Sequence, residues 1–329
     1  MTDFTELPDL ANARLGGVVL AANDDFFAPK ENLLLESEPV WKEGVYTERG
    51  KWMDGWETRR RRQPGHDWCL VRLGLPGIVR GVVVDTSFFR GNFPESCAIE
   101  AAALQEDPTL AGEAHDSRFR EILPRSPLAG HEKNRFAIPE AGHATHLLLR
   151  IYPDGGVARL RAHGEVGPDW RRLPADQLID LAAIEHGGRV IDASDMFFGH
   201  RHRLIYPGSP RGMFDGWETK RRRGPGHDWA IVSLGAPGTI RRAIVDTSHF
   251  KGNAPGACSL QGAATKEVPA ADSNWFEILP RQELEPDDER AFEREIAVHP
   301  AARHVRLNIF PDGGVARLRL FGIRAPDAG

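Results

Sequence analysis

The sequence predicts an all-β fold, with two tandem β-sandwich repeats, most simply jelly rolls, and a few short helices. Two observations support this prediction. Many short segments alternate apolar and polar residues between Gly/Pro turns, as strands with one buried face do. Long sequence blocks also occur twice, in the same order, along the 329 residues.

The repeated blocks divide the chain into halves. "DGWETRRRR" (54–62), "PGHDW" (64–68) and "VDTS" (84–87) return 161 residues later, with a single Arg-to-Lys change in the first. "EILPR" (121–125) returns after 156 residues and "PDGGVARLR" (153–161) after 158. The changing offset indicates insertions between fixed blocks, as loops vary around a scaffold. We therefore predict one repeat over 1–168 and a second over 169–329.

The individual strands follow from the alternation. We expect strands at 68–74, 78–87, 229–235 and 240–248, each bounded by Gly or Pro. Residues 304–310 place Val305, Leu307 and Ile309 on one face, "PDGG" reads as a turn, and alternation resumes at 315–322. This pattern predicts a hairpin. "PADQLIDLAAIEHGG" (174–188) predicts a short helix closed by glycine.

The composition excludes several classes of protein. The net charge of −5 argues against a general nucleic-acid binder, whose domain is basic. No apolar run approaches the length of a membrane span, and the acidic start predicts no signal peptide. Three widely spaced cysteines make no disulfide framework. We expect a cytoplasmic protein.

The arginine run is the first candidate for chemistry. If it is extended, Arg59 and Arg61 face one way and Arg60 and Arg62 the other. One pair can then bind a carboxylate while the other braces acidic neighbours. An exposed loop that pairs with itself is the alternative, but Trp56 has no evident use in such a loop.

Other candidates accompany the run in each repeat. His66 and His227 suit proton transfer near neutral pH, although a structural histidine is equally plausible. Asp85 and Asp246 end apolar strands before loops that contain Asn92 and Asn253, and each aspartate is either a ligand or a turn cap. The repeats differ here, because His249 replaces Phe88. Arg159 and Arg317 lie on a predicted polar strand face, and Asp24 and Asp195 suit either a metal site or a turn.

These blocks resemble those of the allantoicase family over nearly the whole chain. The resemblance implies two jelly-roll repeats of the galactose-binding-like type, a homo-oligomer, and the hydrolysis of allantoate to ureidoglycolate and urea in purine degradation. We expect catalysis from His66, His227, Asp54, Asp215, Glu57, Glu218, Asp85 and Asp246. We expect substrate binding by Arg60, Arg221, Arg62, Arg223, Asn92, Asn253, Arg159, Arg317 and His249.

Other interpretations stay open at this point. A non-catalytic β-sandwich that binds a small ligand or carbohydrate would display exposed aromatics, which Trp56, Trp68, Trp217 and Trp229 could supply. A related ureido-compound hydrolase or lyase and a duplicated structural protein are further alternatives. No cofactor is indicated with certainty, and a divalent metal such as Mn²⁺ is an open option because Asp, Glu, His and Asn suit it.

Overall fold

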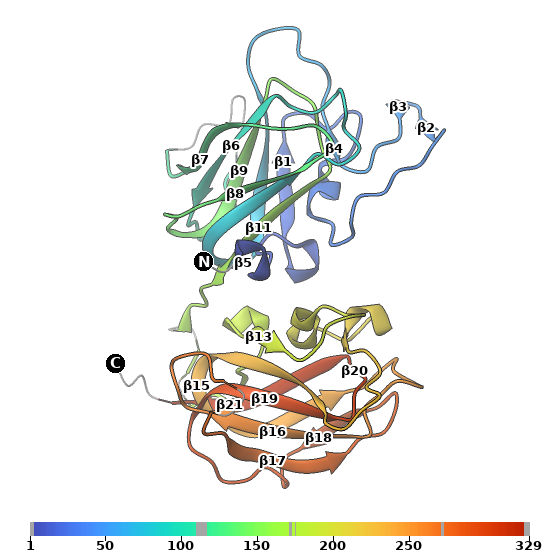
Figure 1. Ribbon diagram of the computed structural model, residues 1–329. Helices are drawn as coiled ribbons and strands as arrows, with labels where there is room; N and C mark the ends of the chain where they lie inside the picture. The colour runs from blue at the N-terminus through green and yellow to red at the C-terminus, as the bar shows by residue number, and fades with distance from the viewer. Residues whose placement is uncertain (1–2, 110–116, 171–172, 175, 271–272, 326–329) are drawn as a thin grey trace. The chain divides into compact units, whose positions relative to one another are not determined.

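The computed structural model describes residues 3–109, 117–170, 173–174, 176–270 and 273–325. The chain divides into two compact units, Met1–Gly167 and Pro168–Gly329. Both are built of antiparallel strands, which confirms the all-β prediction, and the described helices are 3₁₀ helices of three to five residues (Figure 1). In the described ranges, no helix has the length and apolar character needed to cross a membrane.

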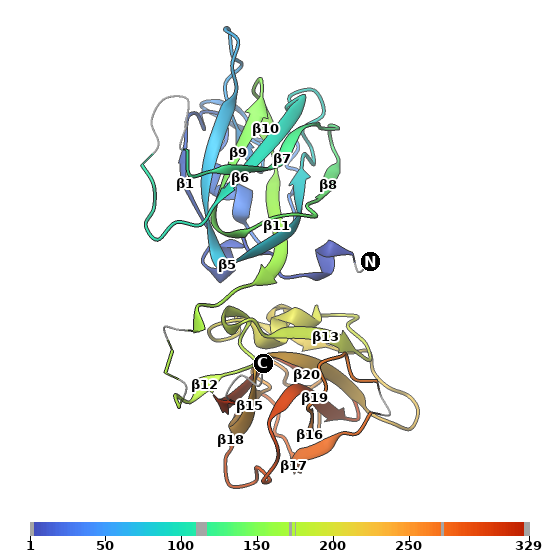
Figure 2. The ribbon, with the colours of Figure 1, turned by 90° about the vertical axis from the view of Figure 1, so that its left-hand side faces the viewer.

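The first unit is organised around one long strand, β5 (Asp67–Asp85). The N-terminal part of β5 lies between two neighbours in a layer ordered β1 (Val18–Ala22), β5, β9 (His143–Tyr152), β6 (Ser96–Ala102) and β7 (Arg120–Pro127). Its C-terminal part pairs with β8 (Lys133–Ala137) and β11 (Arg159–Val166). Strand β5 therefore runs from one layer of the sandwich into the other (Figure 2).

The prediction of separate strands at 68–74 and 78–87 is wrong. The pairing of β5 with β9 shifts register between Arg72 and Gly77, and Pro76 lies within that irregularity. A proline is tolerated there because no ladder hydrogen bond is required of it. The second repeat has the same arrangement, with a register shift between Ser233 and Gly238 in β15 (Asp228–Asp246).

The second unit repeats this topology. Its first layer is ordered β13 (Arg189–Ala193), β15, β19 (Ala302–Phe310), β16 (Ala257–Ala263) and β17 (Phe276–Glu283). Around the C-terminal part of β15 lie β18 (Glu289–Phe292) and β21 (Arg317–Arg324), and β12 (Ile179–Asp180) pairs with β21.

The predicted hairpin is also wrong. Strand β19 pairs with β15 and β16, whereas β21 pairs with β15 and β12. Val305, Leu307 and Ile309 are fully buried as the alternation predicts. Alternation reports which face is buried and not which strand is the neighbour, so the two strands lie in different layers. Between them, β20 (Gly314–Val315) pairs with β14 (Trp217–Glu218).

The helix predicted at 174–188 is much shorter. Strand β12 occupies part of this range, and the 3₁₀ helix η5 (Ile184–His186) follows it. Gly187 ends η5 with a φ of +87°, as the glycine signal predicts. Ala175 lies outside the described residues.

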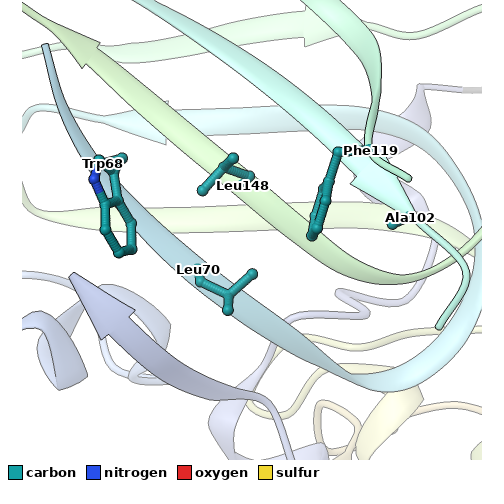
Figure 3. Packing of buried hydrophobic residues seen from close by; sticks show 5 residues of the cluster. All are labelled: Trp68, Leu70, Ala102, Phe119 and Leu148. Carbon is teal, nitrogen blue, oxygen red and sulfur yellow. The ribbon is translucent and has the colours of Figure 1, made fainter. Parts of the chain in front are cut away.

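Strand β9 is buried on both faces. Leu147 and Leu149 of β9 are fully buried on one face, and Leu148 is fully buried on the other. Leu148 packs with Trp68, Leu70, Ala102 and Phe119 (Figure 3). Trp68 is therefore part of a core cluster. This packing fixes the positions of the strands that are joined by the "DGWET", Gly-Asn and "PDGG" loops.

Candidate active site

Three of the repeated blocks meet at one end of the first unit. Strand β4 (Trp56–Glu57) pairs with β10 (Gly156–Val157), which joins "DGWET" to "PDGG". Thr58 N donates to Gly155 O and Gly155 N donates to Thr58 Oγ1, both at 3.1 Å. Gly156 N donates to Asn92 O at 2.8 Å, which adds the Gly-Asn loop. Backbone hydrogen bonds and one bond to the Thr58 hydroxyl thus hold the three blocks together.

Gly155 makes the close approach of these loops possible. Its φ is +137°, and a Cβ at this position would lie 2.7 Å from Asn92 O. Any other residue would be strained and would push the loops apart. Turn geometry and packing therefore both explain this glycine.

The joined loops surround a pocket of about 910 Å³. Its lining is Phe27, Glu57, Thr58, Arg59, Arg60, Arg61, Arg62, Gly91, Asn92, Phe93, Glu95, Pro153, Asp154 and Gly155. The arginine run is therefore one wall of a pocket that the Gly-Asn loop and the "PDGG" turn also line.

The arginine side chains alternate as the sequence predicts. Arg59 forms an ion pair with Asp24 at 2.8 Å, and Arg61 forms one with the buried Asp67 at 2.8 Å. Arg60 and Arg62 are exposed, line the pocket, and contact no acidic side chain among the residues described. One pair of arginines thus braces the wall, and the other presents positive charge to the pocket.

The braces are themselves held by further hydrogen bonds. Arg61 N donates to Asp154 Oδ2 at 2.8 Å, and Asn23 Nδ2 donates to Asp67 Oδ1 at 2.7 Å. The indole N–H of Trp56 donates to Asp24 O at 2.7 Å, and the ring is fully buried. The idea that the tryptophans form an exposed platform is therefore wrong: Trp56, Trp68 and Trp217 are buried and Trp229 is half-buried.

Glu57 is the carboxyl group that faces this pocket with an altered acidity. Burial raises its pKa, and a hydrogen bond from Asn92 Nδ2 to Oε1, at 2.7 Å, opposes part of that rise. The bond also fixes the direction of the carboxyl group. A carboxyl group with a raised pKa that lines the same pocket as two arginines is suited to donate a proton.

Other predicted residues of the first unit lie outside this pocket. Asp54 forms a buried ion pair with Arg159 at 3.0 Å, in which Arg159 is 1% exposed, so this arginine is not on a solvated face. Asp85 accepts from Ser87 N at 2.8 Å and lines a separate pocket of about 480 Å³. His66 Nε2 lies 2.8 Å from Arg150 Nη1, and its ring contacts Tyr152.

The second unit places its counterparts in the same way. Asn253 Nδ2 donates to Glu218 Oε1 at 2.6 Å, and Arg317 pairs with Asp215 at 3.0 Å. Arg222 pairs with Asp228, while Arg221 and Arg223 are exposed and contact no acid in the described ranges.

The remaining predicted residues of this unit lie as follows. Asp246 accepts from Ser248 N and lines, with Arg317, a separate pocket of about 390 Å³. His227 Nε2 lies 3.2 Å from Asn308 Oδ1, and His249 Nε2 lies 3.1 Å from Pro210 O.

The charge of the pocket suits an anion better than a cation. Among the described residues, no group of three or more His, Cys, Asp and Glu side chains is arranged to hold a metal. The half-buried Asp24 and the buried Asp67 are already paired with arginines of this wall. The donor set of this pocket therefore does not fit a divalent cation.

Sequence reasoning missed Asp67, Asp154 and Thr58. Asp154 belongs to "PDGG", and turn geometry accounts for the glycines but not for a carboxylate that accepts from Arg61 N. Its return as Asp312, which accepts from Arg222 N at 2.8 Å, was the available signal. Thr58 and Asp67 also recur, as Thr219 and Asp228.

Comparisons with known proteins agree with this arrangement of blocks. The Allantoicase repeat model matches residues 8–167 and 179–325. A probable allantoicase of Pseudomonas aeruginosa (strain UCBPP-PA14) is 49% identical over 325 residues, which is 97% of this chain and 96% of the relative. A probable allantoicase of Nocardia farcinica is 48% identical over 320 residues, covering 97% and 95%.

A solved structure supports the same relationship. The crystal structure of allantoicase from Saccharomyces cerevisiae superposes with a TM-score of 0.82 at 34% identity, covering 96% of this chain and 93% of that one. Both repeats and nearly the full length are included. The chain therefore belongs to the allantoicase family of hydrolases.

Proposed function

We propose that this protein hydrolyses allantoate to ureidoglycolate and urea in purine degradation, and that the pocket of the first repeat performs this reaction. One observation supports the assignment most strongly. Glu57, whose pKa burial raises, faces the same pocket as Arg60 and Arg62, which have no acidic partner among the described residues. Allantoate offers a carboxylate for the arginines and ureido nitrogens for the glutamic acid.

The arginines bind and orient the substrate. Arg–carboxylate hydrogen bonds are charge-assisted, and a guanidinium can engage both carboxylate oxygens. Arg60 and Arg62 flank the braced Arg61, so their backbone positions are fixed before the substrate arrives. Binding the carboxylate there orients the carbon between the two ureido groups toward the pocket interior.

Glu57 supplies the proton for the departing group. The bond between the central carbon and one ureido nitrogen breaks, and that nitrogen takes the Glu57 proton and leaves as urea. Water adds its oxygen to the central carbon and returns a proton to the Glu57 carboxylate, which regenerates the acid. The products are urea and ureidoglycolate, and atoms and charges balance. General acid catalysis of this kind contributes about 10²- to 10⁴-fold.

The other predicted catalytic groups have supporting roles in this proposal. Asp54 anchors Arg159 and so holds the start of the "DGWET" block. Asp85 caps its turn through Ser87 N. The imidazole of His66 contacts the Arg150 guanidinium and does not line this pocket, so it does not supply the proton in this proposal.

We further propose a homo-oligomer located in the cytoplasm. Trp41, Val45 and Tyr46, on and before the small hairpin of β2 (Tyr46–Thr47) and β3 (Gly50–Lys51), are exposed apolar side chains available for association. The three cysteines are free and buried, which is compatible with a reducing compartment. Light scattering and cell fractionation test these two expectations.

Urea release from allantoate by the purified chain tests the proposed function. We expect one urea for each allantoate consumed, with the same rate after exhaustive chelation and after Mn²⁺ is added. No release by folded protein would overturn the assignment. Release that is lost on chelation and restored by Mn²⁺ would show that a metal takes part and would replace the Glu57 route.

A further inference from the structure

We infer that the second repeat contains a second, independent site for the same class of ligand, a small carboxylate with a ureido arm, so that each chain has two sites. The inference rests on the proposed function and extends it to residues Glu218, Arg221, Arg223 and Asn253. All the contacts that support this site lie within the second unit.

The acid of the first pocket has a counterpart in the same setting. Asn253 Nδ2 donates to Glu218 Oε1 at 2.6 Å, against 2.7 Å between Asn92 and Glu57. Gly314 N donates to Asn253 O at 2.8 Å, the distance found between Gly156 and Asn92. The Gly-Asn loop therefore holds a glutamate side chain in both repeats.

The wall of arginines is also rebuilt. Arg222 pairs with the buried Asp228, and its backbone N–H donates to Asp312 Oδ2 at 2.8 Å, as Arg61 does to Asp154. Arg221 and Arg223 on either side are exposed and contact no acidic side chain among the described residues. In the described part of the chain, Arg221 and Arg223 make no ion pair that would stabilise the loop, whereas together with the held carboxyl group of Glu218 they suit an anionic ligand.

The loops that carry these groups are held by the same backbone contacts. Thr219 N donates to Gly313 O, and Gly313 N donates to Thr219 Oγ1, both at 3.1 Å. Gly313 has a φ of +134°, and a Cβ there would lie 2.4 Å from Asn253 O. The second repeat has thus kept the costly close approach of its loops along with the polar groups.

The rim is where the two sites differ. Phe93 and Glu95 line the first pocket, and Ala254 and Gly256 stand at the matching positions of the second repeat. Phe198, the counterpart of the pocket residue Phe27, is 62% exposed. The second site therefore lacks one ring and one negative charge near the ligand. We expect it to bind the same carboxylate with a different affinity, and to accept a bulkier arm.

Calorimetric titration of allantoate into Glu57→Gln/Glu218→Gln tests the number of sites, because this variant keeps the arginines and should consume the ligand about 10²- to 10⁴-fold more slowly than wild type. We expect about two allantoate bound per chain. A further Arg221→Met/Arg223→Met change should reduce this to one, as should Arg60→Met/Arg62→Met. The exposed pair Arg241→Met/Arg294→Met is the charge-matched control and should leave two. One bound allantoate that only the Arg60/Arg62 change removes would overturn the inference.

Turnover by the single variants gives an independent test. Glu57→Gln and Glu218→Gln should each retain a measurable part of the urea release. A loss of more than about 100-fold in Glu57→Gln, with no change in Glu218→Gln, would overturn the second site while the proposed function stands. Two bound allantoate without urea release from the wild type would instead overturn the proposed function and leave two binding sites.

Discussion

The two repeats agree in their site loops and differ on the sheet behind them. In both, the Asn–Glu hydrogen bond, the bond from the backbone N–H of the braced arginine and the Thr–Gly bond recur with donor–acceptor distances that match within 0.1 Å. On the sheet, Leu148 of the apolar cluster in Figure 3 is replaced by Arg306, which lies 4.6 Å from the Trp275 ring centre.

A second position on the sheet shows the same drift. Arg150 of β9 pairs with Glu100 at 3.1 Å, and at the matching positions of the second unit Asn308 donates to Gln261 at 3.0 Å. A charged pair has become a neutral one. Different side-chain combinations can pack the same sheet stably, so the sheet contacts differ between the repeats. The loops have the same polar contacts in both repeats, which indicates that their function restricts which residues can stand there.

The largest expected effect concerns the buried ion pairs that anchor "DGWET". Asp215→Ala would leave Arg317, which is 2% exposed, without its carboxylate, and should lower the free energy of unfolding by about 3–5 kcal/mol. Asp54→Ala should cost less, because the Asp54 side chain is 10% exposed against 1% for Asp215. Urea denaturation of both variants measures the difference, and equal losses below about 1 kcal/mol would contradict it.

The next largest effect concerns stability at equivalent sheet positions of the two repeats, Leu148 and Arg306. Leu148→Ala removes a fully buried side chain from the cluster of Figure 3 and should cost about 2–5 kcal/mol. Arg306→Ala, at the matching position, should cost only about 1 kcal/mol, because burial already disfavours this charge and lowers its pKa. Thermal unfolding followed by tryptophan fluorescence compares them. A larger loss for Arg306→Ala would show that its stacking on Trp275 outweighs desolvation.

A smaller effect is expected from the residue that directs the acid. Asn92→Ala should reduce kcat by about tenfold, equivalent to one lost hydrogen bond of about 1.4 kcal/mol, and should leave KM nearly unchanged. It should also shift the basic limb of the pH–rate profile to higher pH. The bond from Asn92 lowers the pKa of Glu57 by favouring the ionised carboxylate, so its loss raises that pKa. A rise in KM at constant kcat would instead make Asn92 a binding group.

The smallest effect is on stability against pH. The raised pKa of Glu57 means that folding favours its protonated form, so its contribution is complete below the unfolded-state pKa and is lost as pH rises through the folded-state pKa. Glu57→Gln should therefore gain stability relative to wild type as pH rises. The exposed Glu121→Gln is the control and should show no such trend. A relative loss of stability at high pH would contradict the assigned direction.

Much of the fold could be predicted because burial leaves a local signal. The alternation in 304–310 predicted three fully buried side chains correctly. Partners were not predictable, because β15 joins β19 and β21 through contacts that no local pattern encodes. The strand break expected near Pro76 failed because a register irregularity accommodates proline without ending the strand.

The candidate site shows the same division. Alternation within Arg59–Arg62 predicted that one pair is braced by acids and the other is not, since neighbours along an extended chain point oppositely. Asp54 was expected to be catalytic and Arg159 to bind the substrate, but the two side chains form a buried ion pair with each other. They are 105 positions apart, so sequence spacing could not reveal this contact. Trp56 is buried because its N–H finds a loop carbonyl, a partner visible only in the folded chain.

The central claim is that the held glutamates of the arginine-walled loops supply the proton for urea release. The most direct measurement is the rate of urea release from saturating allantoate by Glu57→Gln/Glu218→Gln, compared with wild type at equal folded concentration. We predict a fall of about 10²- to 10⁴-fold, with allantoate still bound. A double variant that releases urea at close to the wild-type rate would contradict the account.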